Sequence, residues 1–435
     1  MTLGPRRHLI LQWVRAFFGS APFARALSLT AVGTAFCAHA IRSTVGWPGL
    51  IGALATLVVL AAVSFIAHRG SIEWQGLLPI SLLAFVSWSA ISLIWSNNPS
   101  WTLVGVGYQI VLAFLAVYVA LVRDTIQVVR LIGDVLRVLL GVSLGLEVLS
   151  GLLIDMPIAF LGIQGNLAYG GPIQGLFGTR NQLGFVALIG FVTFLVEWRT
   201  RSVRRGTGAF SIALATLCLL LSGSPTVAVA LVVVGVATLA LFGLRAVAPH
   251  ARRGWQVVLV ILTLISLVIA FVIRTRIIDF LNGRSEFQAR YTLWIQIWQL
   301  IPVNPLQGWG WVGRWPADLA PYSWINFAID AHQRNALNAF LDVTLQLGLI
   351  GLLAFIGLLA LALGRSWLLA ANKHSVIYIW SPLILLALIV TSAFESTVLV
   401  EGGWMLLVIC SIKAAQGMSW RLRLTAPVPP GLPHR

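Results

Sequence analysis

Residues 48–67 read PGLIGALATLVVLAAVSFIA, a run of 20 residues without a charged side chain. A helix needs about 20 mostly apolar residues to cross a hydrocarbon core about 30 Å thick, so this run predicts a membrane-spanning helix. Similar runs recur along the chain and predict about twelve spans, although the shortness of two of them leaves ten or eleven open. The approximate bounds are 26–44, 48–67, 76–95, 101–122, 131–154, 181–197, 209–223, 226–244, 255–273, 336–363, 376–395 and 397–412.

The composition of the whole chain agrees with this pattern. Of the 435 residues, 59% are hydrophobic and 10% are charged, whereas a soluble domain carries about 25% charged residues. A large water-soluble fold is therefore excluded, and a single all-α polytopic transmembrane domain over residues 1–435 is predicted. The first apolar run is expected to be a retained helix rather than a cleaved signal peptide. Three cysteines lie far apart in apolar runs and predict neither a disulfide framework nor a metal site.

The net charge of +16 is concentrated between the apolar runs. With a cytoplasmic N-terminus, 20 of the 29 basic residues lie in cytoplasmic segments, 8 lie outside, and Arg137 lies within a span. Cytoplasmic loops of membrane proteins carry such an excess of arginine and lysine. The charge pattern therefore predicts an even number of spans with both termini cytoplasmic, and it does not predict a nucleic-acid partner.

Two of the predicted outer segments are unusual. The segment 155–180 is rich in glycine and glutamine, and a long loop, about 274–335, contains six tryptophans. A loop longer than about 15 residues usually has a function or structure of its own. Within the long loop, residues 286–300 predict an amphipathic helix. We expect this loop to carry part of any functional site.

Basic side chains of the outer segments are the first candidates for such a site. Guanidinium groups match the oxygens of phosphate, so the arginines suggest an anion site. For any single arginine, a lipid headgroup or a nearby carboxylate is the alternative partner. The eight outer arginines are Arg42, Arg180, Arg274, Arg276, Arg284, Arg290, Arg314 and Arg334.

His332 is the one histidine of seven that this topology places in an outer loop. An isolated histidine is more often structural than catalytic. An imidazole, with an ordinary pKa of about 6.5, can nevertheless accept a proton from a hydroxyl nucleophile. His332 is therefore a candidate base that shares a membrane face with the arginines.

Residues 308–313 spell G-x-G-x-x-G, but no preceding strand supports a dinucleotide site. We interpret these glycines as tight turns that let the backbone approach a ligand or a helix end. The neighbouring Trp309 and Trp311 are either membrane-interface anchors or a stacking surface for sugar rings.

Five ionisable residues fall within or beside the predicted spans. Asp134 and Arg137, three residues apart, share a helix face and are expected to pair. Glu147 is a third such residue. Glu395 and Glu401 flank the turn between the last two spans, where they are expected to bind an acceptor, to orient an arginine, or to be solvated at headgroup level.

Three short elements follow one another between residues 178 and 351. They are Gly178-Thr179-Arg180-Asn181-Gln182-Leu183-Gly184; Arg290-Tyr-Thr-Leu-Trp294 with Pro305-x-x-Gly308-x-Gly310; and Ala331-His332 before Leu341 and Gly348-Leu349-Ile350-Gly351. In this order and spacing they resemble the O-antigen ligase and O-antigen polymerase superfamily of exopolysaccharide production. Two features depart from the family pattern: residues 221–226 lack a basic side chain, and Gln333 follows His332 where asparagine is common.

The resemblance implies a GT-C-like membrane fold and a metal-independent, inverting glycan transferase. It would act at the outer face of the bacterial cytoplasmic (inner) membrane without a cofactor. Its donor would be a glycan linked to polyprenyl (undecaprenyl) diphosphate, and its acceptor a glycan or a lipid-anchored sugar, amid membrane lipids. Ligase and polymerase differ only in the acceptor, which the sequence leaves open.

The same resemblance suggests roles for individual residues. His332 would be the base, while Arg180 and Arg290 would bind the diphosphate and stabilise charge on the leaving group. Further substrate contacts are expected from Arg284, Arg314, Arg334, Asn181, Trp294, Trp309 and Trp311.

A multi-span transporter or flippase for an anionic solute or a lipid-linked sugar is the main alternative. It would predict ionisable residues near mid-membrane and two pseudo-repeated halves. The sequence contains no evident repeat, and its notable polar residues gather at the outer edge. A purely structural scaffold would leave the outer arginines and His332 unexplained.

Overall fold

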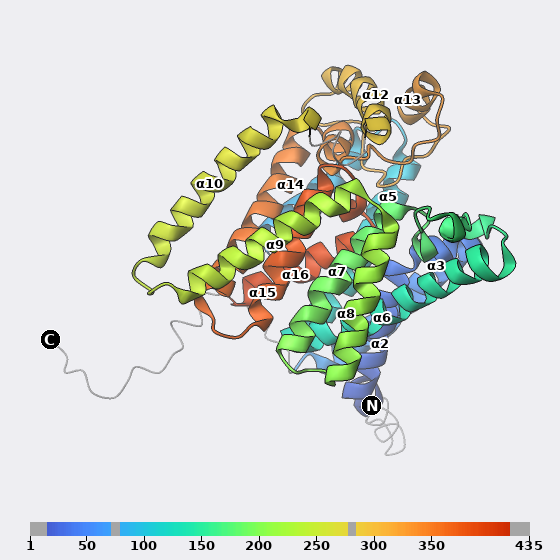
Figure 1. The fold of residues 1–435 in the computed structure, drawn as a ribbon. Coiled ribbons are helices and arrows are strands. Elements are labelled where there is room, and N and C mark those ends of the chain that lie inside the picture. The colour runs from blue at the N-terminus through green and yellow to red at the C-terminus, as the bar shows by residue number, and fades with distance from the viewer. Residues whose placement is uncertain (1–14, 71–78, 277–283, 418–435) are drawn as a thin grey trace, which may run out of the picture.

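The computed structural model describes residues 15–70, 79–276 and 284–417. Across these ranges the chain is a bundle of α-helices without a β-strand (Figure 1). The one strand-like feature is an isolated bridge between Ile158 and Ile163. The predicted all-α class is therefore confirmed for the part of the chain that is described.

Each predicted span overlaps a helix, although the start of the run 76–95 lies outside the described residues. The helices are α2 (Ala21–Phe36), α3 (Ala38–His68), α4 (Ile80–Ile91), α5 (Pro99–Val122), α6 (Thr125–Val148), α7 (Arg180–Arg199), α8 (Arg205–Ser222), α9 (Pro225–Ala246), α10 (Arg252–Val272), α14 (Ala339–Asn372), α15 (Ile377–Ser392) and α16 (Glu401–Gly417). Among the described residues, 8 helices are long and apolar enough to cross a membrane: α3, α5 to α10, and α14. The chain is thus a multi-pass membrane protein by helix length and composition, and a count of twelve spans remains a prediction.

Two helices contain a sharp break at a glycine. Gly46 in α3 has φ 72° and is followed by Pro48, which marks the boundary predicted between the first two spans. Gly348 in α14 has φ 66° and separates a short first part from the long apolar remainder. Left-handed backbone of this kind is easily adopted only by glycine.

Hydrogen bonds between loops show that every second loop along the chain lies at the same end of the bundle. At the end that carries the long loop, Trp95 Nε1 donates to Gln307 O (3.0 Å) and Ile173 N donates to Leu221 O (3.1 Å). At the opposite end, Lys413 Nζ donates to Arg123 O (2.6 Å). In Figure 1 the long loop is at the top and the turn between α7 and α8 at the bottom. This alternation agrees with the predicted topology, while the assignment of the upper end to the outside rests on the charge bias.

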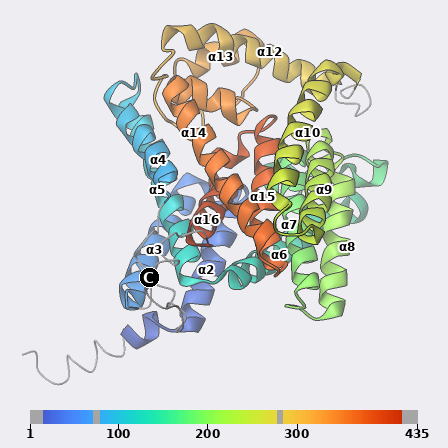
Figure 2. The same ribbon diagram turned by 90° about the vertical axis from the view of Figure 1, so that its left-hand side faces the viewer.

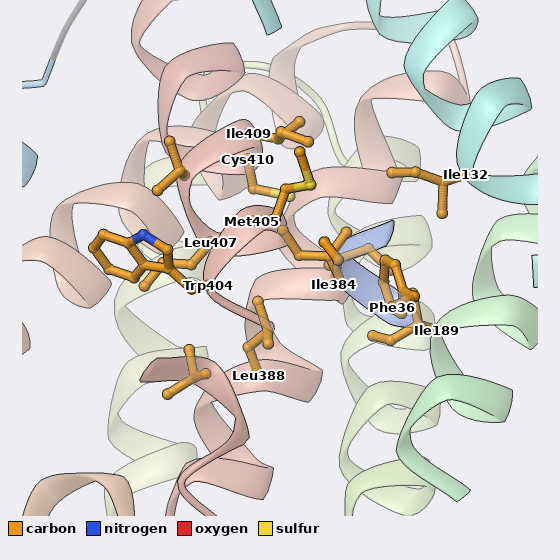
Figure 3. Close-up of a cluster of buried hydrophobic side chains, with 14 of the residues drawn as sticks. Phe36, Ile132, Ile189, Ile384, Leu388, Trp404, Met405, Leu407, Ile409 and Cys410 are labelled. Carbon is orange, nitrogen blue, oxygen red and sulfur yellow. The ribbon is translucent and has the colours of Figure 1, made fainter. Parts of the chain in front are cut away.

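The centre of the bundle is formed by α15 and α16, which are almost completely buried. Figure 3 shows Trp404, Met405 and Leu407 of α16 packed among side chains of neighbouring helices. The buried indole N–H of Trp404 donates to Gln109 O (3.1 Å), so its one polar atom is satisfied. The most apolar window of α10, by contrast, has no buried residue, as expected for a helix surrounded by lipid.

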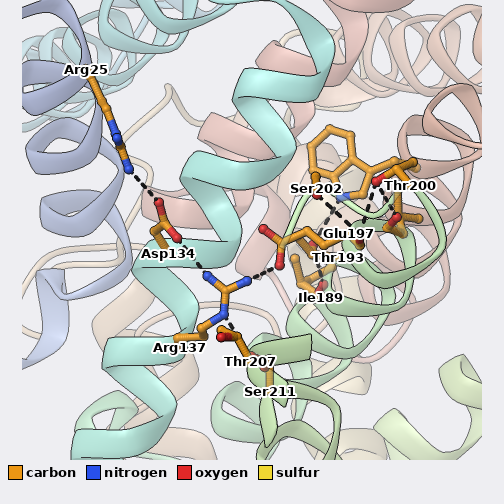
Figure 4. Close-up of polar contacts among 12 residues, drawn as sticks. Arg25, Asp134, Arg137, Ile189, Thr193, Glu197, Thr200, Ser202, Thr207 and Ser211 are labelled. Atoms are coloured by element: carbon orange, nitrogen blue, oxygen red, sulfur yellow. Dashed lines mark hydrogen bonds and ion pairs between the residues drawn. The ribbon is translucent and has the colours of Figure 1, made fainter. Parts of the chain in front are cut away.

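A polar network joins four helices in the lower half of the bundle (Figure 4). Arg137 donates to Asp134 Oδ1 (2.7 Å), which confirms the predicted pair. Arg137 also binds Glu197 of α7 and Ser211 of α8, and Asp134 reaches Arg25 of α2 (3.2 Å). The network thus ties α2, α6, α7 and α8 together with opposite charges.

Candidate active site

The long loop forms a cap with a hydrophobic core of its own. It contains α12 (Arg284–Leu300) and α13 (Tyr322–Ile329), and Figure 2 shows α12 lying across the end of the bundle. The predicted helix at 286–300 is confirmed as α12. Its inner face buries Leu293 and Ile297, while Trp298 on another face is 60% exposed.

The glycine-rich turn of the cap packs on the break in α14. Trp309 N donates to Leu345 O (3.0 Å), and Gly310 N donates to Gln346 O (2.8 Å). Gly308 has φ 70°, and a Cβ there would meet the backbone at Gln346, while a Cβ on Gly348 would meet the backbone of Leu306. The glycines therefore allow two backbone segments to touch, which is the helix-end interpretation of the G-x-G motif.

Two buried polar residues of α14 hold this turn. Asp342 Oδ1 accepts hydrogen bonds from Trp315 Nε1 (2.8 Å) and from Gln346 Nε2 (2.7 Å). Gln346 Oε1 in turn accepts from the backbone N–H of Val312 and Gly313 (2.8 and 2.9 Å). Our sequence analysis did not single out Asp342 or Gln346. Their spacing of four residues within an apolar helix was the available signal, because polar groups there need partners.

Arg290 of the cap forms an ion pair with Glu395 of the bundle. Its side chain is 7% exposed, and its Nη2 donates to Glu395 Oε1 (2.8 Å). Its Nη1 donates to Phe394 O and to Leu337 O. The guanidinium plane is therefore held by the turn between α15 and α16, as one of the alternatives for Glu395 predicted.

Asn181 lies beside this ion pair. Its Nδ2 donates to the same Glu395 oxygen (2.9 Å), and its Oδ1 accepts from Ser224 Oγ (2.6 Å) at the N-cap of α9. Two predicted site residues, Arg290 and Asn181, thus share one acceptor atom. Arg180 precedes Asn181 as the first residue of α7, whose N-cap is Thr179.

His332 is exposed in the loop between α13 and α14. The next residue, Gln333, is held at both backbone groups by Asn326 of α13: Gln333 N donates to Asn326 Oδ1 (2.9 Å), and Asn326 Nδ2 donates to Gln333 O (3.2 Å). Gln333 is one of the departures from the family pattern, and its backbone anchors the loop that carries His332.

A second cationic cluster surrounds Glu401, the first residue of α16. Arg42 of α3 forms an ion pair with Glu401, and Arg314 Nη1 lies 3.9 Å from the same carboxylate oxygen. Burial, and after it the charge of Arg42, lowers the pKa of the Arg314 guanidinium to about 10. Arg334, also a predicted site residue, is close enough to add to this repulsion. Arg314 is therefore a charged, partly buried group at neutral pH.

The predicted tryptophans have different environments. Trp294 Nε1 donates to Ala336 O (2.9 Å), and Trp309 is only 8% exposed. Trp311 has no exposed surface and packs edge-on against Phe85, with ring centroids 5.9 Å apart. In this conformation Trp311 is neither an interface anchor nor an open sugar surface, because protein covers its ring.

Two further observations concern the last predicted substrate-binding residue, Arg284, and possible metal sites. The side chain of Arg284 lies outside the described residues, although the residue begins α12. Among the described residues, no three His, Cys, Asp or Glu side chains form a group that could hold a metal ion.

Comparison with known proteins finds a match to one family model. Residues 210–356 match the family model described as O-antigen ligase, and no curated protein matches the chain. The matched segment runs from α8 into α14 and includes Arg290, the glycine-rich turn and His332, whereas Arg180 and Glu395 lie outside it. About a third of this multi-pass membrane protein, residues 210–356, is therefore similar to the O-antigen ligase family.

Proposed function

We propose that this chain is a metal-independent, inverting glycan transferase at the outer face of the bacterial cytoplasmic membrane. The family match supports a membrane glycan ligase or polymerase in general terms. The proposed donor is a saccharide on polyprenyl (undecaprenyl) diphosphate. The proposed acceptor is either a second lipid-linked glycan, for a polymerase, or a lipid-anchored sugar, for a ligase.

The observation that carries the proposal is the shared contact of Arg290 and Asn181 with Glu395. The described contacts of Arg290 leave its Nε and one N–H of Nη2 without a partner among the described residues. A guanidinium has five such donors in a planar fork. These two remaining donors suit an anion. The start of α7 is close by, because Asn181 shares the Glu395 oxygen with Arg290, and a helix N-terminus favours negative charge.

The proposed reaction needs a base and a stabilised leaving group. An acceptor hydroxyl oxygen forms the new bond to the anomeric carbon from the face opposite the diphosphate. The bond from that carbon to the diphosphate oxygen breaks, and its electron pair leaves with the diphosphate. His332 takes the hydroxyl proton, and Arg180 and Arg290 stabilise the charge on the departing diphosphate. Attack from the opposite face inverts the configuration.

The cluster around Glu401 is a second place for an anionic substrate group. Arg42 and Arg314 together exceed the charge of Glu401 by one, and Arg334 lies near them. We assign Arg314 and Arg334 to substrate binding on this basis. Trp294 and Trp309, which belong to the cap, are proposed to shape the sugar path.

Reconstitution tests this function. Purified protein in nanodiscs would be given polyprenyl diphosphate-linked oligosaccharide and candidate acceptors with EDTA present, and the products analysed by gel and mass spectrometry. Chain growth on the lipid carrier would identify a polymerase, and transfer to a distinct acceptor a ligase. His332→Ala should give no product, whereas the control His374→Ala, on a loop at the opposite end, should be active.

Two results would contradict the proposal. Loss of transfer in EDTA that Mg²⁺ restores would overturn metal independence. An absence of product from every donor, with movement of the glycolipid across a sealed vesicle membrane, would favour the transporter.

A further inference from the structure

The turn between α7 and α8 forms a cavity of about 570 Å³. It lies at the end of the bundle opposite α12 and α13 (Figure 1). The cavity is lined by Trp198, Arg199, Arg201, Val203, Arg204 and Arg205. We refer to it as the α7–α8 arginine pocket.

The four guanidiniums of this pocket are not neutralised by any carboxylate that the structure describes. No ion pair or side-chain hydrogen bond links any of them to another described residue. The adjacent carboxylate, Glu197, is fully buried and is turned toward Arg137, as Figure 4 shows. Four like charges around one cavity repel one another, and this repulsion is relieved by an anion.

The start of α8 adds to the positive potential. Its N-cap is Arg204, which makes no side-chain capping bond, and no acidic residue lies in its first turn. A helix N-terminus carries a partial positive charge, so Arg204 and Arg205 occupy positions that disfavour cations. Arg199, at the end of α7, is by contrast favourably placed. The unfavourable pair is explained if an anion binds between them.

The wall of the pocket places it at a membrane surface. Trp198 is 46% exposed, and a Cβ on Gly208 of α8 would lie 3.0 Å from Cδ1 of Trp198, so the indole rests closely against α8. Exposed tryptophans at the ends of spanning helices typically lie at the headgroup level of the bilayer. The pocket therefore opens where lipid phosphates are found.

We propose that the α7–α8 arginine pocket binds the phosphate headgroup of an anionic phospholipid. Guanidinium forks match phosphate oxygens in geometry and charge. The charge bias of the loops assigns this end to the cytoplasmic leaflet, where basic pockets between helices bind anionic lipids. This site is remote from the cap, and it does not depend on the proposed transfer reaction.

Native mass spectrometry of the detergent-purified full chain tests the proposal. Wild type should retain phosphatidylglycerol in preference to phosphatidylcholine. The variant Arg199→Gln/Arg201→Gln/Arg204→Gln/Arg205→Gln should bind phosphatidylglycerol at least about tenfold more weakly, since each basic residue near an anionic surface adds to binding.

A matched control removes the same charge at the same end of the bundle. Arg130→Gln/Arg253→Gln/Arg365→Gln/Lys373→Gln should keep the preference for phosphatidylglycerol. An equal loss of binding in both quadruple variants would overturn the pocket in favour of diffuse surface charge.

Wild type alone provides a second test, which stands even if a variant fails to fold. Phosphatidylglycerol should raise the midpoint of thermal unfolding more than phosphatidylcholine does, and inorganic phosphate at the same concentration should have little effect. Equal protection by inorganic phosphate would show that the ligand is a soluble anion. Equal retention of the two lipids would overturn the proposal.

Discussion

A single carboxylate oxygen, Glu395 Oε1, accepts hydrogen bonds from both Arg290 and Asn181. It joins α12 of the cap to α7 of the bundle through one charged acceptor. The two donors are 109 residues apart in the sequence, so no local pattern could have paired them. Glu395 is the residue whose role the structure clarifies most, because it orients an arginine rather than facing solvent.

Replacement of Arg290 by lysine should abolish transfer in the reconstituted assay. An ammonium cannot satisfy Glu395 and two carbonyl oxygens while also presenting a planar fork to a diphosphate. Product formation is the readout, and correct folding would be checked by size-exclusion chromatography. Near wild-type transfer by Arg290→Lys would show that the guanidinium plane is not used.

His332→Ala should lose transfer while donor binding stays nearly unchanged. His332 is exposed and has no described side-chain partner, so its removal should also leave the fold intact. Binding of the lipid-linked donor and product formation would be measured on the same preparation. A large loss of donor binding, or transfer at the wild-type rate, would argue against its role as the base.

Loss of the Glu395 carboxylate should destabilise the site. Arg290 and Glu395 are both mostly buried, and removal of one partner of a buried ion pair costs about 3–5 kcal/mol. Glu395→Ala should therefore lower the midpoint of thermal unfolding clearly. Asp318 is exposed in the cap loop and forms no ion pair with another described residue, so Asp318→Ala should leave the midpoint nearly unchanged. Equal midpoints for the two variants would mean that the pair contributes little.

At the scale of elements, the break in α14 positions the cap. The first part of α14 supplies Asp342 and Gln346, which hold the glycine-rich turn. The helix is then interrupted at Gly348, whose φ is positive. The loop that contains His332 leads directly into this helix. The part of α14 before the break therefore links the loop of the predicted base, His332, to the long membrane-spanning part of the helix.

Gly348→Ala should reduce both stability and transfer. Its φ of 66° is strained for alanine, at roughly 1 kcal/mol or more, and the added Cβ would meet the backbone of Leu306. The control Gly357→Ala lies on the same helix, where an added Cβ meets nothing within 4 Å. We expect that control to be neutral or stabilising by about 0.5–1 kcal/mol. Thermal unfolding and product formation would be compared, and similar behaviour of the two variants would contradict the role of the break.

For the whole molecule, the described contacts place the cap at one end and the basic turns at the other. The positive-inside tendency predicts that the arginine-rich end faces the cytoplasm, and therefore that the cap with His332 faces outward. The orientation matters for function, because a glycan acceptor outside the cell can reach only an outward cap.

Cysteine labelling in intact cells measures this orientation. Phe327 of α13 is 92% exposed, and Phe327→Cys should react with a membrane-impermeant thiol reagent. Arg204→Cys should react only after the cells are permeabilised. The native Cys218 and Cys410 are buried, and the parent protein provides the background. The reverse labelling pattern would place the cap inside and exclude the proposed outer site.

The lengths of the apolar runs and the helical spacing of residues were sufficient for much of the architecture. They predicted spans that coincide with helices, the cap helix α12 and the Asp134–Arg137 pair, because spacing along one helix is a local property. The resemblance to the O-antigen ligase and polymerase superfamily also depended on short local elements, such as Arg290 to Trp294, and on their order along the chain.

Other features depended on contacts between distant segments. The helices α10 and α16 are both apolar, yet the most apolar window of α10 has no buried residue whereas α16 is mostly buried, because hydrophobicity does not tell a protein neighbour from a lipid neighbour. The sequence made Trp311 a candidate for sugar binding, but in the folded protein its ring is buried and packs against Phe85. Glu395 could become the partner of Arg290 only when α12 lay across the bundle. Local sequence thus determined which segments could span a membrane and which side chains could carry a charge. The tertiary structure decided which of these side chains contact one another, because burial and charge pairing depend on neighbours far along the chain.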